Sequence, residues 1–109
     1  MKLSTLIYRG LKVPNVVEDR SIYFQPLDLD GGKKKCYACA VGIALLGAAG
    51  SIEKAAKLMQ GKPPSSSIHA LVAKLSNTPL EIVDLLDKDH MNKLGSARQL
   101  AAELRKKHL

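Results

Sequence analysis

Apolar residues recur every three or four positions along much of this chain, which is the spacing of helices that bury one face. Pro14, the 61–64 segment with Gly61, Pro63 and Pro64, and Gly95 interrupt this pattern. Between these breaks, the spacing predicts short helices over residues 3–10, 51–60, 66–76, 79–90 and 96–107.

A different pattern fills the segment from Cys36 to Ala49, where nearly every residue is apolar or small. A helix that is apolar on all sides is expected in the interior of a protein. The segment is shorter than the roughly 20 residues that cross a membrane, so we expect a buried central helix and no membrane segment. Gly50 is a suitable stop and Ser51 a suitable N-cap for the next helix.

Local signals refine the helix ends. Thr78, Pro79 and Glu81 have the spacing of a capping box with proline in the first turn, so they predict the start of a helix. Ser96 is expected to cap the last helix, and Gly10 to end the first one in a left-handed conformation.

Residues 16–35 lack a helical period and are expected to form a structured loop or a small hairpin. The predicted fold class is therefore all-α: a single helical domain over residues 1–109, with about five to six short helices packed around the central Ala/Gly-rich helix. Its length of 109 residues suits one hydrophobic core.

The chain is basic, with a formal net charge of +7 and only four aromatic Phe or Tyr residues. Such a charge favours anionic partners when it is clustered, but here the basic residues are spread along the sequence. The first 13 residues do not form a secretory signal, and two cysteines are too few for a disulfide framework. We therefore expect reduced thiols and a cytoplasmic protein.

Several landmarks together resemble a group of small uncharacterised bacterial and phage proteins whose mark is a Cys-Ala-Leu-Gly-Ala-Ala helix. The corresponding segment here runs from Cys39 to Ala44, with Val41 in the place of the leucine. The resemblance implies a helical fold and no particular activity. Its other landmarks are Leu6-Ile7 with Gly10 and Pro14, Tyr23-Phe24, Leu86-Asp87, and Ser96 followed by Leu100-Ala101 and Leu104.

Cys36 and Cys39 have the spacing of a metal or redox site. The lysines at 33–35 and the predicted helix dipole are expected to lower the pKa of the Cys36 thiol. A redox site of this kind usually opens a helix after a strand in a mixed α/β fold, which the sequence does not predict. A zinc site needs two further ligands, and the histidines are not paired at zinc-finger spacing. A thiol or metal site at Cys36 and Cys39 is therefore a second alternative, and no cofactor is expected.

The remaining titratable residues have ordinary structural interpretations. His69 flanks an apolar stripe, and His90 lies in the last turn of its helix, where a cation suits the dipole. Asp84 and Asp87 are expected on the solvent side of the same helix. We therefore predict no catalytic residue and a protein that is not an enzyme.

The leading hypothesis is a non-enzymatic helical domain that acts by association with itself or with another protein. The alternative is a basic helical nucleic-acid-binding protein whose last two helices resemble a helix-turn-helix and contact mainly phosphates. Its candidate contacts are Lys33, Lys34, Lys35, Arg98, Arg105 and Lys106.

Overall fold

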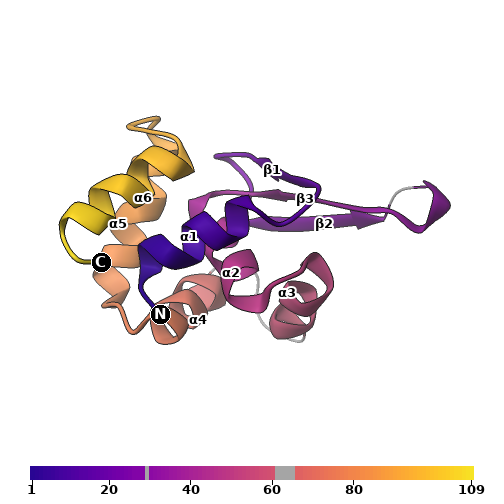
Figure 1. Cartoon of the computed structure of the whole chain (residues 1–109), viewed down its shortest axis with the longest axis horizontal. Helices are drawn as coiled ribbons and strands as arrows, with labels where there is room; N and C mark the ends of the chain where they lie inside the picture. The colour runs from indigo at the N-terminus through magenta and orange to yellow at the C-terminus, as the bar shows by residue number, and fades with distance from the viewer. Residues whose placement is uncertain (29, 61–65) are drawn as a thin grey trace.

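The computed structural model describes residues 1–28, 30–60 and 66–109 (Figure 1). These residues form helices and a small sheet, so the prediction of an all-α fold was wrong and the chain is α/β. The elements in chain order are α1 (Leu3–Leu11), β1 (Val16–Glu18), β2 (Phe24–Asp28), the 3-10 turn η1 (Asp30–Gly32), β3 (Lys34–Ala38), α2 (Ala40–Ala49), α3 (Ile52–Met59), α4 (Ser66–Ser76), α5 (Leu80–Met91) and α6 (Ala97–Lys106).

The sheet is mixed, with strand order β1-β3-β2. β3 pairs with β1 in parallel and with β2 antiparallel. β2 and β3 form a hairpin that extends away from the helices (Figure 1). The loop or hairpin expected over residues 16–35 is therefore a three-stranded sheet that continues to Ala38.

The predicted central helix begins four residues later than expected. Cys36 lies in β3 opposite Val16, and α2 starts only at Ala40. A short apolar run is compatible with a buried strand as well as with a buried helix, and pairing with two neighbouring strands decides between them here. The rest of the prediction is confirmed, because almost all of α2 is buried and it ends at Gly50 in the left-handed conformation.

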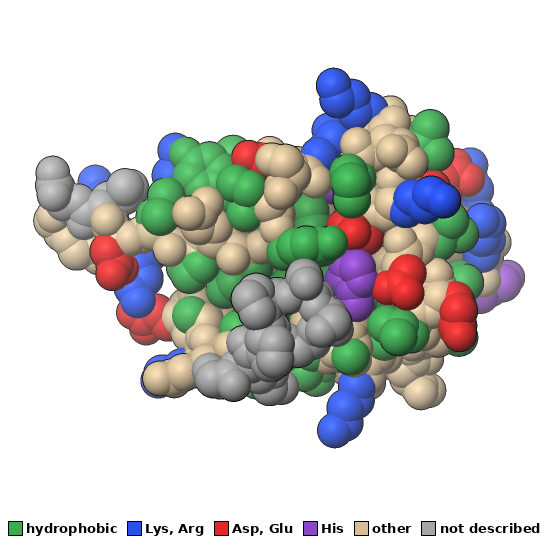
Figure 2. Space-filling view, turned by 180° about the vertical axis from the view of Figure 1, so that it is seen from behind, with side chains coloured by type: hydrophobic (Ala, Val, Ile, Leu, Met, Phe, Trp, Pro, Cys, Tyr) green, Lys and Arg blue, Asp and Glu red, His purple; other side chains and the backbone are tan. Residues whose placement is uncertain are grey.

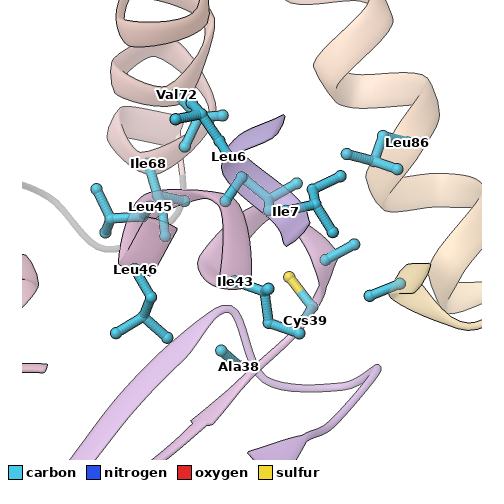
Figure 3. Packing of buried hydrophobic residues seen from close by; sticks show 14 of the residues in the cluster. Leu6, Ile7, Ala38, Cys39, Ile43, Leu45, Leu46, Ile68, Val72 and Leu86 are labelled. Carbon is cyan, nitrogen blue, oxygen red and sulfur yellow. The ribbon is translucent and has the colours of Figure 1, made fainter. Parts of the chain in front are cut away.

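α1 and α2 cross at a distance that only glycine permits. A Cβ atom added to Gly10 would lie 1.8 Å from the carbonyl oxygen of Ile43, and one added to Gly47 would lie 1.8 Å from that of Leu6. Gly10 is thus a contact residue inside α1 and not the predicted helix stop. Around this crossing, apolar side chains from α1, α2 and α4 pack together in the core (Figure 3).

Two of the predicted caps are confirmed. The Ser51 hydroxyl accepts from the Lys54 N–H, and Ser96 forms a capping box with Gln99. The capping box at Thr78 was wrong, since Thr78 donates to the Ser76 carbonyl and α5 has no side-chain cap. The helix break predicted at Gly61, Pro63 and Pro64 lies outside the described residues. Of the helices described, none has the length and apolar character needed to cross a membrane.

Candidate functional site: a pocket around Asp87 and Cys39

The start of α2 is held against the loop that precedes β2. The Cys39 N–H donates to the Ile22 carbonyl at 2.6 Å, and the Asp19 N–H donates to the Ala38 carbonyl at 2.9 Å. A Cβ on Gly42 would lie 1.8 Å from the carbonyl oxygen of Tyr23, so the first turn of α2 touches this loop directly. These contacts place Tyr23 beside Cys39, whose sulfur lies 3.9 Å from the Tyr23 carbonyl oxygen.

α5 supplies the third polar group. Asp87 is only 6% exposed, because it lies on the buried face of α5 with Val83, Leu86 and His90. Its Oδ1 is 3.6 Å from the Cys39 sulfur, which donates to it. The prediction that Asp87 points to solvent was therefore wrong.

Tyr23, Cys39 and Asp87 meet at a hollow of about 190 Å³, which we call the Asp87 pocket. Residues from three separate parts of the sequence line it: Arg20, Ser21, Tyr23, Cys39, Asp87 and Met91.

His69 on α4 lies next to this pocket, between two carboxylates. Its Nδ1 is 2.7 Å from Oδ1 of Asp84, and its Nε2 is 3.5 Å from Oδ2 of Asp87. The Tyr23 ring packs against the His69 ring edge-on, with 5.3 Å between centroids. Figure 2 shows the side of the molecule opposite to that seen in Figure 1. On this side, a histidine lies between acidic side chains and next to hydrophobic ones. His69 is thus part of a polar network and not merely a neighbour of an apolar stripe.

His90 has a structural role in the same region. It is fully buried, and its Nδ1 accepts from the Ala40 N–H at 3.1 Å. Its Nε2 therefore carries the proton that is donated to Oε2 of Glu18, 2.8 Å away. The same Glu18 oxygen accepts from the Ala97 N–H at the start of α6. His90 and Glu18 thereby connect α5 with β1 and with the starts of α2 and α6.

Neither cysteine lies in surroundings that favour its thiolate form. Burial raises the pKa of Cys36 from 9.0 to about 11, so the predicted lowering by the lysines at 33–35 was wrong. Burial also raises the pKa of Cys39 to about 11; the backbone of Gly42 and Val41 works against this rise, and the nearby Asp87 carboxylate adds to it. Burial, followed by the charge of Asp87, raises the pKa of the Tyr23 hydroxyl as well. Tyr23 and Cys39 therefore act in the pocket as neutral hydrogen-bonding groups beside the Asp87 carboxylate.

The two cysteines do not form a common site. Cys36 lies in β3 with its sulfur 3.7 Å from the Tyr37 carbonyl oxygen, whereas Cys39 precedes α2 and faces Asp87. The expectation that no strand precedes the helix, which disfavoured a redox site, was wrong, because β3 directly precedes α2. Across the described segments, no three His, Cys, Asp or Glu side chains converge in a way that could hold a metal ion.

The residues predicted to bind nucleic acid are divided between two ends of the molecule. Lys33, Lys34 and Lys35 lie at or near the tip of the β2–β3 hairpin, while α6 lies at the opposite end of the long axis (Figure 1). Arg98 and Arg105 both lie over the ring of Tyr8, 6.0 and 4.5 Å from its centroid. The candidate contacts therefore do not form one continuous basic surface.

No family model matches the chain, and neither the curated proteins nor the solved structures yield a match.

The sequence did carry one signal for the Asp87 pocket. Val83, Leu86, Asp87 and His90 have the i, i+3, i+4, i+7 spacing of a buried helix face, with polar residues at two of its four positions. Polar residues at core positions need partners, and such networks occur preferentially at functional sites. The partners Tyr23, Cys39 and His69 come from distant segments, so this signal could indicate a site on α5 but not its composition.

Proposed function

We propose that this protein binds a small polar molecule in the Asp87 pocket. The observation that carries the proposal is the convergence of a phenol, a thiol and a buried carboxylate on one hollow. Ligand sites are characteristically concave and mostly apolar, with a few convergent polar groups. The volume of about 190 Å³ suits a ligand of only a few heavy atoms.

Binding is favoured over nucleophilic catalysis by the state of the thiol. A cysteine nucleophile reacts as a thiolate, which a nearby base or cation usually stabilises. The pKa of Cys39 is raised to about 11, mainly by burial, and its polar neighbour is the Asp87 carboxylate. Cys39 is therefore assigned here to the wall of the pocket, as a weak hydrogen-bond donor.

A fragment screen on isotope-labelled protein tests this proposal. We expect some polar fragments of below about ten heavy atoms to bind in the millimolar range and to shift the NMR signals of Tyr23, Cys39 and Met91 together. Replacing Asp87 by Asn should weaken these fragments by about tenfold, because a charged hydrogen bond becomes a neutral one.

Asp89→Asn is the matched control, since it makes the same chemical change on the same helix at a residue outside the Asp87 pocket. It should leave fragment binding unchanged. The proposal fails if no fragment shifts the pocket signals, or if Asp89→Asn weakens binding as much as Asp87→Asn does.

Association remains a second candidate function, because apolar side chains are exposed on and after α5. Leu85 is 49% and Leu94 69% exposed, and Leu85 borders an apolar groove of about 70 Å³ between α5 and α6. If the chain associates with itself through this face, Leu85→Ser/Leu94→Ser should raise the dimer dissociation constant by about tenfold or more in sedimentation experiments. Leu75→Ser, on α4 and 38% exposed, should leave it unchanged. A wild-type chain that stays monomeric at high concentration would contradict self-association.

A further inference from the structure

The Asp87 carboxylate is buried without a full set of strong partners. Within the described chain, its closest polar neighbours are the Cys39 sulfur, at 3.6 Å, and the His69 Nε2, at 3.5 Å. The Tyr23 hydroxyl is a third neighbour and a neutral donor to the carboxylate; burial and this interaction both contribute to the raised pKa of Tyr23. A thiol is a weak donor, and a nitrogen at 3.5 Å is too far for a good hydrogen bond. Buried carboxylates ordinarily have several close donors or a paired cation, because leaving water is costly for them.

The neighbouring cationic side chain is engaged elsewhere. Arg20 also lines the Asp87 pocket, but its Nη2 donates to the Gly95 carbonyl at 3.0 Å and its Nη1 is 3.9 Å from Glu18. Asp84, which pairs with His69, adds a further carboxylate close to the pocket. The surroundings of the hollow are thus acidic, although the whole chain has a net charge of +7.

The pocket wall adds features that suit an organic cation. The Tyr23 ring and the Met91 side chain line the same hollow as Asp87. Aromatic rings attract ammonium groups through their faces, and thioethers provide a polarizable apolar contact.

We propose that the ligand of the Asp87 pocket is a small primary amine whose ammonium group pairs with the Asp87 carboxylate. This inference rests on the proposed function, and it specifies the charge of the ligand. The ammonium supplies the strong donors that the carboxylate lacks, and its alkyl part contacts Tyr23 and Met91. The pocket should therefore prefer this cation to neutral and anionic molecules of the same size.

Three probes of matched size test the charge: n-propylammonium, n-propanol and propionate. We expect n-propylammonium to bind the wild-type chain about tenfold or more tightly than n-propanol, with shifts at Tyr23 and Met91, and propionate to bind least. In Asp87→Asn the ammonium should lose this advantage, while in Asp89→Asn it should keep it.

Equal binding of n-propanol and n-propylammonium would overturn the proposal of a cationic ligand but not the proposal that the pocket binds a small molecule. Tighter binding of propionate would also overturn the cationic ligand and would point to Arg20 instead. If none of the three probes and no fragment shifts the pocket signals, the proposed function fails as well. The comparison of the three probes uses the wild-type chain, so it stands even if Asp87→Asn does not fold.

Discussion

Replacing Gly47 by Ala is expected to lower the free energy of unfolding by about 3 kcal/mol or more. In an ordinary helix the same change would stabilise by about 1 kcal/mol, because alanine is the better helix former. Here the new methyl group would lie 1.8 Å from the Leu6 carbonyl oxygen and would also crowd the backbone of Gly10. Backbone atoms cannot rotate away, so α1 and α2 must separate and loosen the core between them. Urea unfolding followed by circular dichroism measures the loss.

Two further variants test whether the close crossing is the cause. Gly95→Ala should change stability by less than about 1 kcal/mol, since the atom nearest to the new Cβ would be the Gln99 Cβ, at 3.3 Å. Gly10→Ala should be as harmful as Gly47→Ala, but the double variant should lose less than the sum, because helices already separated accommodate both methyl groups. A Gly47→Ala protein as stable as the wild type would contradict this packing.

The helical half of the fold was accessible from the sequence because its signals are local. The i, i+3, i+4 spacing of α4 and α6, the Ser96 cap and the end of α2 at Gly50 all depend on residues that are close in the chain. The sheet is different. β1 pairs only with β3, about 20 residues later in the chain, and β3 contributes an apolar run that also suits a helix. Whether such a run extends or coils is decided by its distant partners, which periodicity cannot reveal.

The same distinction explains the candidate site. Asp87 was assigned to the solvent side because Asp84, three residues away, suggested a shared acidic face. The two carboxylates instead contact His69 on a different helix, Asp84 from the exposed side and Asp87 from the buried side. A pair spaced i, i+3 spans about 60° of the helix surface, so one member can lie at the border of the core while the other is exposed. Knowing which one is buried required the position of α4.

The burial of both thiols also explains why their chemistry differs from what their spacing in the sequence suggested. The sequence spacing of Cys36 and Cys39 suggested joint reactivity, and the lysines at 33–35 suggested an activated thiolate. Because both cysteines are buried in the core, desolvation is the largest influence on each thiol and its pKa moves upward. This shift predicts how the whole protein responds to alkaline pH.

Between pH 9 and pH 11 the free energy of unfolding is expected to fall by several kcal/mol, and at most by about 5. In the folded chain the pKa of Cys36 and of Cys39 is about 11, against an ordinary 9.0. The unfolded chain therefore loses its thiol protons first, and ionisation draws the equilibrium toward it. The stabilisation is fully present below pH 9 and is lost as the pH rises through 11. Urea unfolding at a series of pH values, under reducing conditions, measures the slope.

Cys36→Ala/Cys39→Ala is the control that assigns this slope to the thiols. The variant should be less stable at neutral pH, because two buried sulfurs are removed, but its stability should depend much less on pH above 9. A smaller slope of the same sign should remain, since the pKa of Tyr23 is also raised, mainly by burial. Tyrosinate and thiolate both absorb near 240 nm, so the absorbance of the wild type minus that of this variant reports the thiolates, and it should stay low for the folded proteins at pH 9.5. Thiolate formation at that pH, or equal slopes in both proteins, would show that the thiols are not shielded as the structure requires.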